Sequence, residues 1–198
     1  RPTSSKVREA IFHKLSDSLE DSVFVDVFSG TGAIGLEALS RGAKGCYFVE
    51  KDFSTVKVLR KNMELAYERL KKQGVEPSPY KVLCLPAQKA LPKLKDSHAE
   101  ASWILWADPP YAKLFDWLRS FYPEKLPFFD NLELIVIELD AEDMSKPEFS
   151  LAGWEKIFEK VYGGTAEWDA AGNNVCQAWN LALASVGLHL LIRYLSMK

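Results

Sequence analysis

Residues 23–39 (VFVDVFSGTGAIGLEAL) constrain the fold of this chain more than any other stretch. A run of β-branched and aromatic residues meets a glycine-rich turn, and apolar residues at helical spacing follow. This order predicts a strand, a tight turn and a helix. Gly30, Gly32 and Gly35 fit the spacing G-x-G-x-x-G, which lets the backbone approach a ligand closely and points a helix N-terminus at it.

Asp26 helps to decide which ligand this turn suits. Dinucleotide-binding and S-adenosylmethionine-binding folds share the glycine pattern, and such a turn can also be purely structural. A dinucleotide presents its pyrophosphate to the turn, and a carboxylate four residues before Gly30 would repel that anion. S-adenosylmethionine carries a sulfonium and an ammonium group, so Asp26 favours it over NAD. The alternative is that Asp26 is a hydrogen-bonded polar residue at a strand end.

A second motif closes another apolar strand, at residues 103–111 (WILWADPPY). Pro109 and Pro110 have no N–H to donate and hold an extended backbone, which leaves carbonyl groups free to accept hydrogen bonds. Together with the carboxylate of Asp108 and the ring of Tyr111, they form a receptor for a planar amine. The same four residues could also be a plain turn that ends the strand.

Further strands and helices alternate along the chain. Residues 45–50 predict a second strand ending in Glu50, which can bind both ribose hydroxyl groups of NAD or S-adenosylmethionine. Strands are also expected at 80–85, 103–107 and 132–139, and helices are expected from residue 3 to Leu19, over 53–73 and over 113–121. This pattern predicts an α/β fold: a mostly parallel, Rossmann-like sheet with helices on both faces and ligands at the C-terminal strand ends.

Composition limits the classes of function. With 198 residues, 47% hydrophobic and 26% charged, the chain can bury the core of one domain. The net charge of −2 does not indicate nucleic-acid binding, so any basic surface must be local. Cys46, Cys84 and Cys176 are far apart and predict free thiols in a cytoplasmic protein. No ligand spacing predicts a metal, and no opening signal peptide is expected.

Both motifs resemble those of Rossmann-like methyltransferases that act on amino groups. The closer resemblance is to the RsmD family, guanine-N2 methyltransferases of small-subunit (16S) ribosomal RNA. It rests on residues 1–12 (RPTSSKVREAIF), 25–43 (VDVFSGTGAIGLEALSRGA), 48–52 (FVEKD) and 108–111 (DPPY), and it covers residues 1 to about 165. The resemblance implies S-adenosylmethionine as the cofactor and ribosomal RNA, or a precursor of the small ribosomal subunit, as the partner. We expect a monomer that enters no membrane.

The resemblance also implies roles for individual residues. The residues expected to be catalytic are Asp108, Pro109, Pro110 and Tyr111. The residues expected to bind the cofactor are Asp26, Phe28, Ser29, Gly30, Gly32, Glu50, Lys51, Ala87 and Gln88. The residues expected to contact RNA are Arg1, Thr3 and Arg8, with the basic helix at 57–72 as a further candidate. Where the family commonly has an acid or amide near adenine, this chain has Pro86, so the backbone of Ala87 or the Gln88 amide must serve instead.

The last part of the chain departs from the family pattern. Residues 154–162 predict a late strand and Gly163-Gly164 a hairpin turn, but residues 166–198 form an atypical extension expected to pack on or beside a methyltransferase domain of residues 1–165. Apolar residues at 179, 183, 186, 190 and 194 predict a helix there. Other functions stay open: methylation of DNA adenine or protein glutamine, an NAD-dependent oxidoreductase, or a non-catalytic RNA-binding module.

Overall fold

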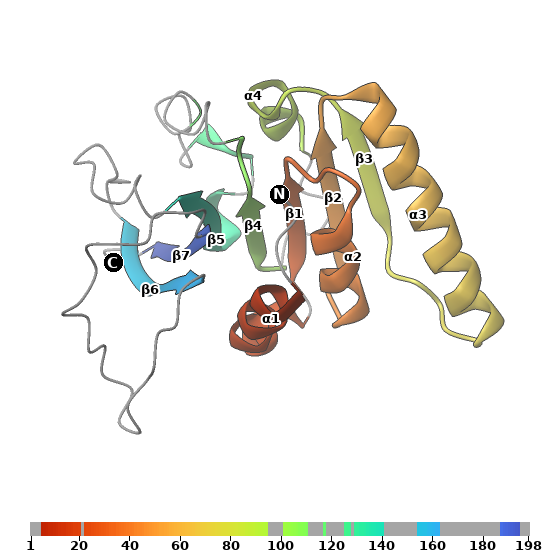
Figure 1. Cartoon of the computed structure of the whole chain (residues 1–198), viewed down its shortest axis with the longest axis horizontal. Helices are drawn as coiled ribbons and strands as arrows, with labels where there is room; N and C mark the ends of the chain where they lie inside the picture. The colour runs from red at the N-terminus through yellow and green to blue at the C-terminus, as the bar shows by residue number, and fades with distance from the viewer. Residues whose placement is uncertain are drawn as a thin grey trace.

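A seven-stranded sheet with helices on both faces organises the chain (Figure 1). The computed structural model describes residues 5–20, 22–94, 101–110, 117, 125–127, 129–140, 154–162 and 187–194. The helices are α1 (Ser5–Leu19), α2 (Ala33–Ser40), α3 (Phe53–Lys72), α4 (Ala87–Ala90) and the short 3-10 turns η1 (Leu91–Lys93) and η4 (Phe129–Asn131). The strands are β1 (Val23–Val27), β2 (Gly45–Glu50), β3 (Tyr80–Cys84), β4 (Trp103–Ala107), β5 (Leu132–Asp140), β6 (Trp154–Tyr162) and β7 (Gly187–Tyr194).

The strand order is β3-β2-β1-β4-β5-β7-β6, and the first five strands in this order are parallel. β7 runs antiparallel to both β5 and β6. From β1 the chain builds outward through β2 and β3, and it then returns to add β4 on the other side of β1. This reversal creates a crevice between the C-terminal ends of β1 and β4, which is the usual ligand site in open α/β sheets. The predicted Rossmann-like α/β fold is confirmed.

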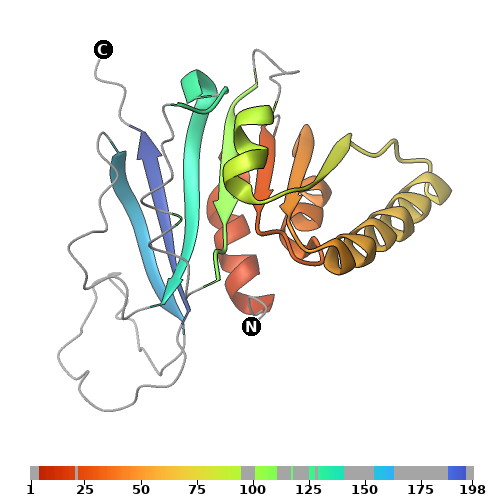
Figure 2. The same ribbon diagram turned by 90° about the horizontal axis from the view of Figure 1, so that it is seen from above.

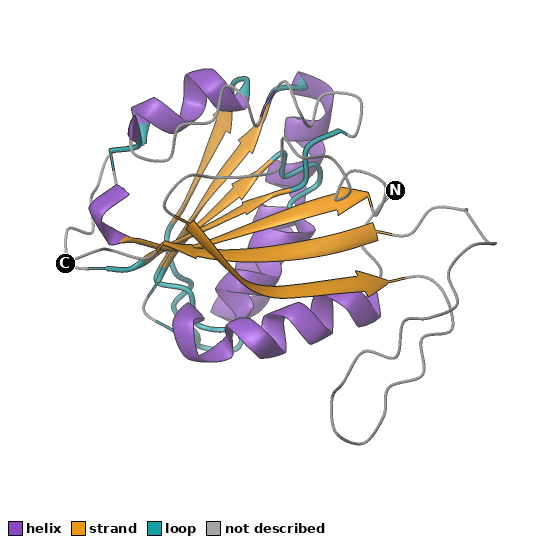
Figure 3. Ribbon diagram, turned by 90° about the vertical axis from the view of Figure 1, so that its left-hand side faces the viewer, coloured by secondary structure: helices purple, strands orange, loops and turns teal. Residues whose placement is uncertain are grey.

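Helices cover both faces of the sheet (Figures 2 and 3). Alternating residues of the strands supply a hydrophobic core on each face. On one face α1, α2 and α3 bury Ile11, Leu15, Ala38 and Leu59 against Phe24, Phe48 and Trp106. On the other face α4, η1 and Trp117 pack over Val25, Leu105 and Ile137. The helical spacing seen in residues 5–19 therefore reflects burial, since Ile11, Leu15 and Leu19 are fully buried.

The expectation of a helix near the end of the chain is wrong for residues 187–194, which form β7. Residues 186, 190 and 194 lie four apart, and that spacing fits the period of a strand as well as that of a helix. Leu188, Leu190, Ile192 and Tyr194 make one face apolar, and the alternate positions hold His189, Leu191 and Arg193, as in a strand with one more polar face. Residues 163–186 and most of 113–121 lie outside the described residues, so the turn and helices expected there stay predictions.

No helix in the described ranges is long and apolar enough to cross a membrane. Cys46 is buried and Cys84 is half-buried, and both are free thiols. In the same part of the chain, no group of three or more His, Cys, Asp or Glu side chains is placed to hold a metal ion.

Candidate active site

The glycine-rich turn after β1 is held in a conformation that few residue types tolerate. Phe28 has φ 64°, and Gly30 and Gly32 have φ 52° and 86°. Positive φ is uncommon for a residue with a side chain and is often found where function requires it. The turn is fixed by hydrogen bonds from Ser29 N to Val49 O (3.1 Å) and from Gly32 N to Ser29 O (2.8 Å). The predicted turn is therefore rigid and lies beside the end of β2.

The buried Asp26 side chain links β1 to the helix that follows this turn. Its side chain is 2% exposed, and its Oδ2 accepts a hydrogen bond from Gly35 N at 2.9 Å, within the first turn of α2. Burial raises the pKa of Asp26 to about 7. The hydrogen bond from Gly35 N lowers this pKa in part, and the negative charge of Glu50 raises it further. Asp26 is thus a hydrogen-bonded polar residue near the end of β1, which is the alternative named from the sequence. Its role toward a cationic ligand stays a prediction.

Glu50 connects the turn after β1 to the start of α3. Its Oε2 accepts from Gly30 N at 3.1 Å, and its Oε1 accepts from Asp52 N at 2.8 Å. Asp52 caps α3 by accepting from Thr55 N at 2.7 Å. Sequence reasoning placed Glu50 at the strand end but did not foresee that it also holds the turn.

Gly35 lets α2 lie close against β2. A Cβ atom at this position would lie 2.3 Å from Phe48 Cε1 and 2.8 Å from Cys46 Sγ. We expect Gly35→Ala to lower the free energy of unfolding by about 1–3 kcal/mol, because both neighbours are buried and the contact is overpacked. Urea unfolding measures this change. Ser40→Ala, at an exposed site of the same helix, is the control and should change stability by less than about 0.5 kcal/mol.

The Asp108 turn lies directly beside the turn after β1. Asp108 N donates to Val27 O at 3.4 Å, which joins the ends of β4 and β1. Burial, then the charges of Glu138 and Asp26, raise the pKa of the Asp108 carboxyl group to about 7. Glu138, which sequence reasoning missed, is 5% exposed on β5 and follows Ile137, the register partner of Ala107. The available signal was an acid directly after the apolar run 134–137.

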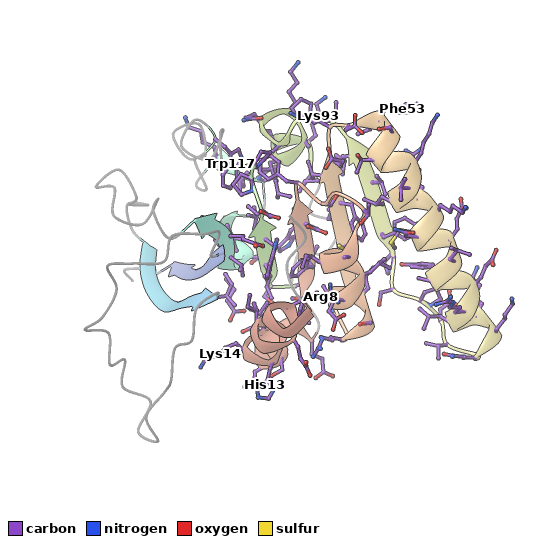
Figure 4. All side chains as sticks on the ribbon, viewed as in Figure 1. Arg8, His13, Lys14, Phe53, Lys93 and Trp117 are labelled. Carbon is purple, nitrogen blue, oxygen red and sulfur yellow. The ribbon has the colours of Figure 1, made fainter. Side chains whose placement is uncertain are left out.

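One pocket of about 270 Å³ joins the two turns, at the end of the sheet where α4 and Trp117 lie (Figure 4). Its lining residues are Phe28, Val49, Lys51, Leu85, Pro86, Ala87, Gln88, Pro110 and Trp117. Four of the residues expected to bind a cofactor, Phe28, Lys51, Ala87 and Gln88, thus meet Pro110 of the second motif. Val49, Leu85, Pro86 and Trp117 were not foreseen, because only their position in the fold brings them to the pocket.

Two other predicted site residues, Ser29 and Arg8, do not line the pocket. Ser29 is 9% exposed, and its Oγ is a buried oxygen without a hydrogen-bond partner. A buried polar atom of this kind suits a ligand that completes its hydrogen bonding. Arg8 lies on α1, with its Nε 3.9 Å from Oε2 of Glu37 on α2 (Figure 4). Tyr111, Arg1 and Thr3 lie outside the described residues.

Comparison with known proteins identifies the family. A family model described as "Conserved hypothetical protein 95" matches residues 1–168. Ribosomal RNA small subunit methyltransferase D of Escherichia coli (strain K12) is 34% identical over 113 residues, which are 57% of this chain and 50% of that protein. The chain belongs to the RsmD family. Another curated relative, "Putative rRNA methyltransferase YlbH" of Bacillus subtilis (strain 168), is 39% identical over 64 residues, 32% of this chain and 35% of that protein.

Solved structures share the fold of this chain. "Putative methyltransferase yhhF" from Escherichia coli superposes with a TM-score of 0.61 at 25% identity, covering 98% of this chain and 88% of that chain. A conserved hypothetical protein of Streptococcus pyogenes has a TM-score of 0.63 at 20% identity, covering 97% and 98%, and shows the fold alone. The chain spans half or less of the length of the two curated relatives in their sequence matches. The RsmD family resemblance inferred from the four sequence blocks is confirmed.

Proposed function

We propose that this chain transfers a methyl group from S-adenosylmethionine to the exocyclic N2 of a guanine in small-subunit ribosomal RNA. The observation that carries the proposal is the junction of the two turns. Asp108 N is bonded to Val27 O, and one pocket touches both Phe28 and Pro110. A cofactor cradle and an amine receptor therefore share one crevice, which is the arrangement that group transfer between two bound molecules requires.

The residues present suit S-adenosylmethionine. The walls of the pocket are mostly apolar, as a base requires, with Lys51 and Gln88 as its polar side chains among the lining residues. Ser29, on the turn after β1, and Glu50, at the end of β2, adjoin the lining residues Phe28 and Lys51 in sequence, and their oxygens can accept hydrogen bonds from polar groups of the ligand. When bound, S-adenosylmethionine supplies an electrophilic methyl group on a positively charged sulfur. The acids Asp26 and Asp108 both lose part of their cost of ionisation when a cation lies nearby.

The Asp108 turn prepares the acceptor. The lone pair of a guanine amino group is delocalised into the ring, so the protein must localise it and aim it. The Asp108 carboxylate and the Pro109 carbonyl can each accept one amino hydrogen, which leaves the nitrogen lone pair directed at the methyl group. Tyr111 stacks on the base in this proposal, and the base must be unpaired or flipped to enter.

Thermal shift with different ligands distinguishes the proposed methyltransferase from an NAD-dependent oxidoreductase. S-adenosylmethionine and S-adenosylhomocysteine should raise the melting temperature, and NADH should not, because a pyrophosphate would face the acid-lined turn. Radiolabelled methyl transfer to ribosomal RNA then separates an enzyme from a non-catalytic RNA-binding module. Stabilisation by NADH alone would favour the oxidoreductase.

The rate should depend on pH through Asp108. The carboxylate form accepts the amino hydrogen, and the raised pKa of about 7 means that this form is fully populated only above neutral pH. We therefore expect kcat/KM for RNA to rise with pH through about 7 and then level off, as a property of the coupled Asp26 and Asp108 pair.

Glu138→Gln removes a neighbouring negative charge, so the pKa of Asp108 should fall and the acid limb should move to lower pH. Glu133→Gln is the control on the same strand, where Glu133 accepts a hydrogen bond from Ser18 Oγ at 3.1 Å. Its pH profile should match the wild type. Profiles that coincide for all three proteins would show that Asp108 does not set the acid limb.

RNA binding should depend on local basic residues, because the net charge of −2 is unfavourable. The candidates are Arg1, Lys6, Arg8 and the basic residues of α3 (Lys57, Arg60, Lys61, Arg69, Lys71 and Lys72). Affinity for small-subunit RNA should fall steeply with salt, since bound phosphates release counterions. A filter-binding titration between low and physiological salt measures this slope. A flat response would indicate few phosphate contacts and a small or protein substrate.

A further inference from the structure

Trp117 lies on the pocket although no sequence motif includes it. Its side chain is 2% exposed, and its ring meets the Phe28 ring edge to face at a centroid distance of 5.5 Å and an angle of 81°. Phe28 is the residue of the glycine-rich turn that has positive φ without being a glycine. A rigid part of the turn therefore holds the ring of Trp117 at the pocket wall.

The rest of the pocket lining is mostly apolar, with Lys51 and Gln88 as its polar side chains. Val49 comes from β2, Leu85 and Pro86 come from the connection between β3 and α4, and Ala87 is the first residue of α4. Pro86 has no side-chain oxygen with which to recognise an amino group. Apart from the Ala87 backbone and the Gln88 amide, which also line the pocket, selection of a flat purine ring then depends on shape and on contact with an aromatic surface. Such a contact can contribute as much as a base–aromatic stack.

We propose that Trp117 is a specificity-determining residue for the cofactor, because it forms the wall against which the adenine ring packs. This inference rests on the proposed function. The contact takes the place of a carboxylate or amide at residue 86, so adenine recognition depends on Trp117 more than on hydrogen bonds from that connection.

Trp103 is a buried tryptophan of the same hydrophobic core that does not contact the pocket, and it serves as the control residue. It is fully buried on β4, stacks on Tyr47 at 5.6 Å and 16°, and does not line the pocket. Trp103→Phe is therefore a matched control for loss of a buried indole.

Calorimetry with two probes tests the proposal. Trp117→Leu should weaken binding of S-adenosylhomocysteine roughly tenfold, and it should weaken adenosine by the same factor, because the lost contact is with the base both probes share. Trp117→Phe keeps an aromatic wall and should stay within about threefold of the wild type. Trp103→Phe should not change either affinity.

A folded Trp117→Leu protein with unchanged adenosine affinity would overturn the proposal. So would a loss of S-adenosylhomocysteine binding without a loss of adenosine binding. If Trp117→Leu weakened RNA binding alone, the pocket would take the target base, and the assignment to adenine would be wrong. If the wild type binds neither S-adenosylhomocysteine nor S-adenosylmethionine, the proposed function itself fails, and this result is distinct from those of the variants.

If Trp117→Leu does not fold, tryptophan fluorescence tests whether adenine packs on Trp117. Adenosine should quench the tryptophan emission of the wild type in a saturable way, and the folded Trp117→Phe protein should lose that quenching while it still binds adenosine. Quenching retained in Trp117→Phe would mean that adenine packs elsewhere.

Discussion

Asp108→Ala is expected to lower the single-turnover rate of methyl transfer by about 10²–10³ and to leave S-adenosylmethionine affinity within a few-fold. This loss is the size seen when one preorganised hydrogen-bond partner of a transition state is removed. Asp108 is held at the end of β4 by its backbone bond to Val27 O, so its carboxylate is fixed before the base arrives. Its effect should therefore appear in the chemical step.

Asp108→Asn should be less harmful than Asp108→Ala, because an amide oxygen can still accept the amino hydrogen. It lacks the negative charge that supports the positive charge developing on nitrogen, so the rates should fall in the order wild type, Asn, Ala. The assay belongs well above pH 7, where the raised pKa of about 7 leaves the wild-type carboxyl group ionised. Asp130→Ala, at an exposed residue of η4, is the control and should react as fast as the wild type. An alanine variant at 108 as fast as the wild type would make the motif a simple strand-ending turn.

Glu50→Ala should weaken S-adenosylmethionine binding by roughly 1.5–3 kcal/mol, the range for hydrogen bonds that involve a charged group. The carboxylate is expected to bind the ribose hydroxyl groups, and it also accepts hydrogen bonds from Gly30 N and Asp52 N. Removing it costs the ligand a partner and loosens the turn that cradles it. Calorimetry at fixed pH measures the change.

Two further variants separate those effects. Glu50→Gln keeps an acceptor oxygen for the turn and should bind with an affinity between those of the wild type and Glu50→Ala. Glu64→Ala, at an exposed position of α3, should bind normally. Cofactor affinity unchanged in Glu50→Ala would remove the end of β2 from the site.

The residues that sequence reasoning placed correctly are those whose roles are local. The turn of Gly30, Gly32 and Gly35 and the ends of β2 and β4 follow from short patterns, because backbone geometry and strand burial leave their mark on neighbouring residues. Strand β7 was missed because a spacing of four fits two periods. Pairing with β5 and β6 settles the choice, and this interaction is not visible in a local window.

The parts of the site that sequence could not supply depend on distant strands. Glu138 affects Asp108 because β4 and β5 are neighbours in register, and Trp117 meets Phe28 across 89 positions of sequence. The hydrogen-bond donor to Asp26 could not be predicted either, because Gly35 N lies nine residues away on the helix that follows the turn. Such pairings follow from the topology, and the sequence patterns indicate only that the groups exist.

Nucleoside mass spectrometry of the RNA product tests the central claim most directly. Small-subunit ribosomal RNA, free or assembled into particles, is incubated with the protein and S-adenosylmethionine carrying a labelled methyl group, and the digested nucleosides are then analysed. The account predicts labelled N2-methylguanosine in the wild-type reaction, with the signal strongly reduced in Asp108→Ala. A labelled methyl group on adenine, or no labelled nucleoside from either form of the RNA by a protein that binds the cofactor, would contradict it.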